Sequence, residues 1–383
     1  MKLLYILKSL ANKSGTERVF SDKINYLAQC GYDITLVTYE QGEHPFSFPL
    51  HQSVHHVDFD TRFFKVGQQP LYKRPFYMYR LRKLFRNRLQ NFVDELSPDV
   101  IICTTYSFHL LDIISTIKTS AYNIIESHVA CFSIKKSYEY RRIPIVCQIL
   151  KLYDAYQMDC LKRFDKMVVL TEGDAAEWRK YISRVVVIPN PVTFFPEQVL
   201  THEEPSNRII CVGRLHEQKG LDMLVKAFSM IASKCPQWYI DIYGSGDEKA
   251  MLCQLIADYN LQGRIVIHEP TTDIYREYQT SDFLVLSSRY EGFALVLLEA
   301  MACGIPCVAF RCKYGPDDVI HHGSDGLLAN NGDIHALADG MLWMATHTEE
   351  RLRMGKAARL TIENYRKEKI MNEWLDLFSH LKE

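Results

Sequence analysis

Long apolar stretches are missing from this 383-residue sequence, as are several other signals that would assign its class at once. No run of 18 apolar residues occurs, so the sequence predicts no membrane-spanning helix. The apolar core of the first ten residues is only five residues long, and we expect a first β-strand there, not a signal peptide. The eleven cysteines follow no paired spacing. They indicate reduced, mostly buried thiols in a cytoplasmic protein.

Glycine-rich and metal-binding motifs are equally scarce. The first expected strand-to-helix loop holds one glycine, Gly15, in place of the GxGxxG pattern of a dinucleotide fold, which argues against an NAD dehydrogenase. Cys303, Cys307 and Cys312 do not have the spacing of a zinc site. Asp58 and Asp60 form a D-x-D pair that could hold a cation on a nucleotide diphosphate. Such pairs are common by chance, so we predict no metal site and no cofactor.

Charge is balanced overall, with a formal net charge of −1, but it is unevenly distributed. Residues 1–190 carry 26 Lys and Arg and 19 Asp and Glu (26 − 19 = +7), whereas residues 191–383 carry 19 and 27 (19 − 27 = −8). This asymmetry predicts an anionic partner for the first half. An expected helix at 76–96 has a basic face that either is solvated or docks on anionic lipid headgroups. Nucleic acid is disfavoured because no recognition motif accompanies the charge. The residues of this face assigned to a membrane or acceptor are Arg80, Arg82, Lys83 and Arg86.

Strand-like and helix-like segments alternate along the chain, which predicts an α/β protein with parallel sheets. The length favours two domains over one core. The best boundary is the proline-bracketed turn at 189–191. We expect residues 40–75 to be irregular, a helix at 108–118, and a turn at 321–329.

The most informative stretch is SSRYEGFALVLLEAMACG, residues 287–304. It predicts the end of a buried strand, a polar loop with Glu291, and a helix with Glu299 about two turns from its start. Ligands bind at such carboxyl edges of parallel sheets, and the first-turn amides of the helix near 293–295 suit an anion. A carboxylate in apolar sequence needs partners. For Glu299 these are either sugar or ribose hydroxyls, or a structural Arg or backbone N–H.

Two further strand ends carry polar or glycine residues. Arg214 and Lys219 stand five apart in an expected strand–loop–helix junction, where two cations and a helix N-terminus could hold a diphosphate; the alternative is ordinary surface charge. Gly244 follows another strand and allows a close approach of backbone to ligand. His128 lies in a loop after a strand of the first half, and is either structural or part of the site.

Three motifs occur in order at suitable separations: GRLHEQKGLDMLVKAF at 213–228, YGSGDE at 243–248 and EGFALVLLEAMACGIPCVAF at 291–310. Together they resemble the retaining family 4 glycosyltransferases of GT-B fold. The likeness extends from NKSGTERV near the start to the terminal helix. It is greatest with bacterial enzymes that build surface polysaccharide or lipid-linked oligosaccharide.

The resemblance implies an α/β GT-B protein, with two Rossmann-like domains whose parallel sheets face a cleft. Residues 1–190 would form the acceptor-binding domain, joined by a C-terminal helix at 367–383 that crosses back to it. Residues 191–366 would bind the nucleotide sugar. The catalytic residues implied are His128, Glu291, Arg214 and Lys219. The donor-binding residues implied are Gly15, Arg214, Lys219, Gly244, Glu269, Pro270, Glu291, Gly292, Phe293, Ala294, Leu295 and Glu299. The usual paired glycines of the first loop appear here as Ser14 and Gly15.

The implied reaction moves a hexosyl or N-acetylhexosaminyl unit from a nucleotide diphosphate sugar, expected to be a UDP-sugar, to a hydroxyl of a glycan or polyprenyl-linked acceptor. The α configuration would be kept, and no metal would be needed because two cations replace it. The enzyme would act in the cytoplasm as a peripheral protein on the inner face of the plasma membrane. Two alternatives are a catalytically inactive sugar-nucleotide-binding partner subunit and a GT-B sugar-nucleotide epimerase.

Overall fold

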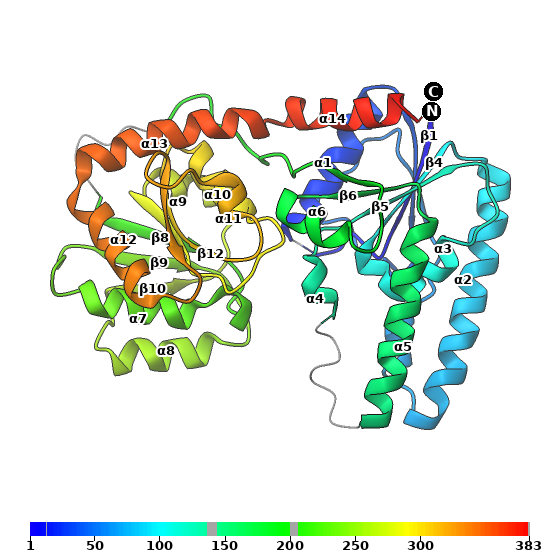
Figure 1. The fold of residues 1–383 in the computed structure, drawn as a ribbon, viewed down its shortest axis with the longest axis horizontal. Helices are drawn as coiled ribbons and strands as arrows, with labels where there is room; N and C mark the ends of the chain where they lie inside the picture. Colours follow the sequence, from blue (N-terminus) through cyan, green and yellow to red (C-terminus); the bar gives the residue numbers. More distant parts are fainter. Residues whose placement is uncertain (13, 136–143, 200–205, 382–383) are drawn as a thin grey trace. The chain divides into compact units, whose positions relative to one another are not determined.

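The computed structural model describes residues 1–12, 14–135, 144–199 and 206–381. The chain divides into two compact units. Unit 1 comprises Met1–Ile188 and Glu373–Glu383, and unit 2 comprises Pro189–Asn372. Figure 1 shows the ribbon of each unit, with labels on most of its helices and strands.

Unit 1 is built on a seven-stranded sheet in the order β3-β2-β1-β4-β5-β6-β7, and the strand pairs are parallel. Central strands such as β1 and β4 are almost continuously apolar because helices cover both faces of a parallel sheet. The strands are β1 (Lys2–Leu7), β2 (Asp33–Thr38), β3 (His55–Asp58), β4 (Val100–Thr104), β5 (Tyr122–Glu126), β6 (Lys166–Val169) and β7 (Val185–Val187). The α-helices are α1 (Gly15–Gln29), α2 (Arg74–Leu96), α3 (Leu111–Ile114), α4 (Cys131–Lys135), α5 (Pro144–Cys160) and α6 (Glu172–Trp178). Short 3-10 helices are η1 (Phe63–Val66), η2 (Leu71–Lys73), η3 (Thr105–Leu110) and η5 (Leu161–Arg163).

Unit 2 has a six-stranded parallel sheet in the order β10-β9-β8-β11-β12-β13. The strand order reverses direction at β8, between β9 and β11, and such switch points favour ligand binding at the carboxyl edge. The strands are β8 (Arg208–Val212), β9 (Tyr239–Tyr243), β10 (Ile265–His268), β11 (Phe283–Leu286), β12 (Cys307–Arg311) and β13 (Gly326–Asn330). The helices are η6 (Glu217–Lys219), α7 (Leu221–Ile231), α8 (Lys249–Asp258), α9 (Ile274–Gln279), α10 (Leu295–Ala302), α11 (Pro316–Val319), α12 (Ile334–Thr346), α13 (Thr348–Ile362), η7 (Glu363–Tyr365) and α14 (Lys367–Ser379).

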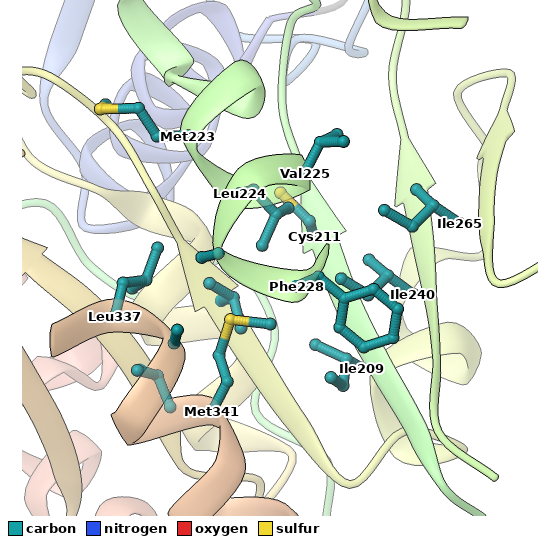
Figure 2. Packing of buried hydrophobic residues seen from close by; sticks show 14 of the residues in the cluster. Ile209, Cys211, Met223, Leu224, Val225, Phe228, Ile240, Ile265, Leu337 and Met341 are labelled. Carbon is teal, nitrogen blue, oxygen red and sulfur yellow. The ribbon is translucent and has the colours of Figure 1, made fainter. Parts of the chain in front are cut away.

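A core of apolar side chains fixes each sheet to its helices. In unit 2, Phe228 of α7 lies over Ile209 and Ile240 of neighbouring strands, and Met341 of α12 joins the same cluster (Figure 2). In unit 1, Phe85 and Leu89 of α2 are completely buried in the corresponding cluster. Each unit therefore has its own core, as the length of the chain predicts.

Local expectations fail mainly at the sheet edges. The segment expected to be irregular contains β3, and the expected turn at 321–329 overlaps β13. Both are edge strands that are short and have one neighbour, so their sequences are less uniformly apolar than those of central strands. The expected helix at 108–118 is instead η3 followed by a single turn, α3. Glu299 lies about one turn into α10, not two, because α10 begins at Leu295.

The C-terminal helix α14 begins in unit 2 and ends in unit 1, since the division between the units falls after Asn372. Within unit 1 the ring of Phe378 contacts Trp374 and Tyr32. Among the described residues, no helix is both long enough and apolar enough to cross a membrane.

Candidate active site

Two loops of unit 2 meet at the carboxyl edge of its sheet, one following β8 and the other following β11. Gly220 makes this approach possible, because it has a φ of +60° and a Cβ at this position would collide with the Ser287 carbonyl. Ser287 Oγ donates to the Lys219 carbonyl at 3.0 Å, and Arg289 N donates to the Gln218 carbonyl at 2.8 Å. Hydrogen bonds thus join the two loops at this edge of the sheet.

Lys219 and Glu291 are brought together at this edge, although 72 residues separate them. Lys219 Nζ lies 2.7 Å from Glu291 Oε1, and Ser288 Oγ donates to the same oxygen at 2.6 Å. Glu291 is only 6% exposed. Its backbone is held by the segment after β12, since Glu291 N donates to the Lys313 carbonyl and Tyr314 N donates to the Glu291 carbonyl. A buried carboxylate with this number of partners is a rigid acceptor for ligand hydroxyls.

Arg214 is exposed on the same loop as Lys219. Its Nη2 donates to Gln218 Oε1 at 3.2 Å, and Gln218 Nε2 in turn donates to the Tyr290 carbonyl at 3.0 Å. Within the described part of the chain, no carboxylate forms an ion pair with Arg214. Its charge therefore stays available for an anion at the loop, in contrast to Lys219, which a ligand would have to share with Glu291.

Two hydroxyl groups donate hydrogen bonds to Glu299. Its Oε1 accepts a hydrogen bond from Thr193 Oγ1 at 3.0 Å, and its Oε2 accepts one from Tyr278 OH at 3.0 Å. Burial and the nearby Glu299 charge raise the pKa of Tyr278 well above its usual value, so Tyr278 remains a donor. Both of these donors are O–H groups, which is the chemistry that a ribose diol would offer.

The start of α10 lies between the two glutamates. Phe293 and Ala294 are buried, Gly292 is half-buried, and Leu295 is the first residue of the helix. The first-turn N–H groups of a helix have no partner within the helix and carry partial positive charge. These N–H groups could meet a phosphate, and in the sequence they lie between Glu291 and Glu299.

Neighbouring loops are joined to this edge by backbone hydrogen bonds. Gly213 N donates to the Tyr243 carbonyl and Gly244 N donates to the His268 carbonyl, both at 3.0 Å. A Cβ on Gly244 would collide with the Gly213 carbonyl, so a glycine is required there. Glu269 and Pro270 follow β10 directly and are exposed; Glu269 pairs with Lys249 at 2.5 Å.

The unit 1 residues named from the sequence occupy the carboxyl ends of β1 and β5. Gly15 is the first residue of α1, with Ser14 at the N-cap position. His128 is turned inward: its side chain is 4% exposed, and Nε2 lies 3.1 Å from Glu126 Oε2. Glu126 also forms an ion pair with Lys23 of α1, and both side chains are almost fully buried.

Burial lowers the pKa of His128 and outweighs the opposite effect of Glu126, so the imidazole is neutral. Burial alone would raise the pKa of Glu126, but Lys23 and His128 hold it below its usual value. Sequence reasoning missed this Lys23–Glu126–His128 cluster. The available signal was an acid at the end of an apolar strand, two residues before the histidine.

Several other charged side chains named from the sequence have local hydrogen-bond or ion-pair partners. Asp58 accepts hydrogen bonds from Thr38 Oγ1 at 2.9 Å and Gly42 N at 2.8 Å, and Asp60 pairs with Arg62. Across the described ranges, no group of three His, Cys, Asp or Glu side chains is arranged to hold a metal ion.

On α2, Arg82 pairs with Asp112 and also donates to the His109 carbonyl, while Arg86 donates to Thr116 at 3.1 Å. Arg80 and Lys83 are exposed. Arg86 is also exposed despite this hydrogen bond, so only Arg82 of the four is half-buried.

Two family profiles together span almost the whole chain. One, described as Glycosyltransferase Family 4, matches residues 13–193, and the other, Glycosyl transferases group 1, matches residues 195–361. The chain belongs to the family 4 glycosyltransferases. It is a glycosyltransferase enzyme.

Full-length relatives agree with this family. An uncharacterized glycosyltransferase of Haemophilus influenzae is 28% identical over 97% of this chain and 98% of its own length. The amylovoran biosynthesis glycosyltransferase AmsD of Erwinia amylovora is 26% identical over 99% of both chains. A poly(ribitol-phosphate) alpha-N-acetylglucosaminyltransferase of Staphylococcus aureus is 30% identical, but over 60% of this chain and 43% of its own length.

The solved structure of TarM superposes with a TM-score of 0.77, covers 98% of both chains and is 16% identical. At that identity the likeness concerns the fold alone. With the two parallel sheets, it shows that this glycosyltransferase has the GT-B fold.

Proposed function

We propose that this glycosyltransferase moves a hexosyl or N-acetylhexosaminyl unit from a UDP-sugar to a hydroxyl of a lipid-linked glycan during surface polysaccharide synthesis, with retention of the α configuration. The observation that carries the proposal is the Lys219–Glu291 pair beside the start of α10. Cation, carboxylate and helix amides are the three kinds of group that a sugar diphosphate needs. The names of AmsD and of the ribitol-phosphate enzyme support a polysaccharide acceptor and an N-acetylhexosaminyl donor.

In this proposal unit 2 holds the donor and unit 1 the acceptor. The diphosphate is bound by Arg214, Lys219 and the first-turn amides of α10. Glu299 accepts hydrogen bonds from the ribose hydroxyls, which replace one of its present partners. Glu291 accepts from the hydroxyls of the donor sugar. Gly244, Glu269 and Pro270 border the nucleotide. Gly15 and His128 remain predicted functional residues of unit 1.

The chemical step breaks the bond between the sugar C1 and the phosphate oxygen, and forms a bond from C1 to the acceptor oxygen on the same face. The acceptor proton passes to the departing phosphate. Lys219 and Arg214 stabilise the negative charge that develops on that phosphate, which is the electrostatic part of catalysis. No protein nucleophile is needed.

The reaction is tested by incubating the purified protein with a mixture of sugar nucleotides and a polyprenyl-diphosphate-linked acceptor. We expect UDP to be released only when acceptor is present, and the acceptor mass to increase by one hexose or N-acetylhexosamine. Binding of nucleotide without any UDP release would favour an inactive partner subunit. Acceptor-independent UDP release with a rearranged sugar would favour an epimerase.

Activity is expected to persist in EDTA. In the proposed site two side-chain cations and the α10 amides would hold the diphosphate without a metal, while Asp58 and Asp60 already have local partners. Initial rates of UDP release should be equal with and without the chelator. A rate that falls in EDTA and recovers with manganese would contradict this prediction and would make Asp58 and Asp60 the first residues to substitute.

A further inference from the structure

Two helices of unit 1 expose regular apolar stripes that nothing in the described chain covers. On η2 and α2, Tyr72, Phe76 and Tyr79 follow one another at helical spacing and are 78%, 66% and 65% exposed. Beside them, Leu71 is 76% exposed. A helix face with this spacing normally lies against a core. Large exposed apolar surfaces of this kind mark sites of interaction.

The second stripe lies on α5. Ile149 is 61% exposed, Leu152 is 73% exposed and Tyr156 is 47% exposed, again at helical spacing. On both helices it is the C-terminal part that enters the core of unit 1: Phe85 and Leu89 on α2 are buried, as are Met158 and Cys160 on α5. The exposed stripes therefore belong to the N-terminal parts of the two helices.

The helices are joined midway through a shared acceptor. Arg82 of α2 and Tyr153 of α5 both donate to the His109 carbonyl, and Arg82 Nη1 also lies 3.5 Å from Tyr153 OH. Figure 1 shows the two helices running toward the same end of unit 1. The two stripes can therefore act as one surface, which we call the two-helix stripe: Leu71, Tyr72, Phe76, Tyr79, Ile149, Leu152 and Tyr156.

Charge identifies the kind of partner. Residues 71–86 contain six Lys and Arg and no Asp or Glu. Of these, Lys73, Arg80, Lys83 and Arg86 are exposed. Tyrosines and other aromatics beside cations suit the headgroup region of an anionic bilayer, where rings enter the interface and cations meet phosphates. A symmetric contact between two copies would instead bring these cations face to face.

We propose that the two-helix stripe inserts into the interface of an anionic membrane and holds the enzyme at its lipid-linked acceptor. The reason for docking rests on the proposed function. The exposed surface itself does not depend on that function. This proposal also changes the prediction made from the sequence for the basic face of α2. Arg82 and Arg86 serve contacts within unit 1, so apolar insertion supplies the attachment and Arg80 and Lys83 add attraction to phosphate.

The experiment measures flotation of the full-length protein with vesicles of phosphatidylcholine alone or with added phosphatidylglycerol. We expect binding to the mixed vesicles and little to the neutral ones. The triple variant Tyr72→Ser, Phe76→Ser, Tyr79→Ser should bind at least about tenfold more weakly, as should Leu152→Ser, Tyr156→Ser. The matched control is Leu352→Ser, Leu360→Ser, which removes two exposed leucines from α13 of unit 2 and should bind like the wild type.

Insertion is separated from electrostatic adsorption by two further measurements. A tryptophan at Phe76→Trp should gain fluorescence with the mixed vesicles and be quenched by lipids brominated on the acyl chains. Unchanged binding of the triple variant, or absence of that quenching, would overturn the proposal. So would a wild-type dimer that the triple substitution converts to monomer without any vesicle binding.

Failure of the docking proposal can be told apart from failure of the proposed function. All stripe residues are remote in sequence from Lys219, Glu291 and Glu299, so transfer to a water-soluble acceptor analogue should be the same in the triple variant and the wild type. Transfer that is retained alongside unaltered vesicle binding would reject only the docking surface. Absence of transfer to any acceptor would reject the function and leave the flotation result standing.

Discussion

Replacing Lys219 with alanine is expected to lower kcat/KM for the donor by about 10²–10³-fold. Removing one preorganised group that stabilises developing negative charge has an effect of this size in other enzymes. Here the loss is compounded because Glu291, 6% exposed, would keep its charge without the ammonium that lies 2.7 Å away. Steady-state kinetics of acceptor-dependent UDP release measure the change directly.

Lys219→Arg should recover part of the rate. The guanidinium restores the positive charge, but it does not have the compact shape of the lysine ammonium. The matched control is Lys226→Ala on the following helix, α7. Lys226 forms a half-exposed pair with Asp222, 3.6 Å away and four residues earlier, and its removal should leave kinetics unchanged. If Lys219→Ala had near-normal kcat and bound UDP normally, the diphosphate would have to be held elsewhere.

Lys23→Met is expected to destabilise unit 1 by about 3–5 kcal/mol, because it leaves the buried carboxylate of Glu126 without its cation. The ammonium of Lys23 also lies over the ring of Trp374 at 4.1 Å, so the change reaches the last helix of the chain. The double variant Lys23→Met, Glu126→Gln removes both charges and should be closer to the wild type in stability than Lys23→Met alone.

Denaturant dependence of hydrogen exchange, followed in peptides from α1 and β5, reports the stability of unit 1 separately from unit 2. Lys162→Met is a matched control, because the Lys162–Asp159 pair is 64% and 60% exposed and should contribute little to stability. Equal loss of protection in the two methionine variants would show that the buried pair contributes no more than a surface pair.

The double variant also examines His128. With Glu126 replaced by Gln, the charge and the hydrogen bond that favour protonation of the imidazole are lost. Loss of the Lys23 charge acts in the opposite direction but is the smaller effect, so the pKa of His128 should fall further. Nitrogen chemical shifts of the histidine side chain across a pH titration would show this, with His128→Asn supplying the assignment.

Particular residues show which parts of the site could be predicted from the sequence. The strand, polar loop and helix around Glu291 and Glu299 could be predicted because burial and helix propensity are local properties of the chain. Gly304 follows α10 with a φ of +76°, and a glycine in this conformation commonly ends a helix. The partners of Glu299 could not be predicted. Thr193 and Tyr278 come from separate parts of unit 2, and their meeting depends on how the segment around residue 193 and α9 are placed against α10.

The sequence by itself determined the alternation of strands and helices, the family, and which residue types stand at the ends of the strands. Each of these depends on spacing along the chain. Only the tertiary structure decided that Lys219 pairs with Glu291, that His128 faces Lys23 and Glu126, and that Arg82 turns away from solvent toward Asp112. The reason is physical: a charged side chain takes its partner from whichever strand or helix the sheet order brings near, and that order joins residues tens of positions apart.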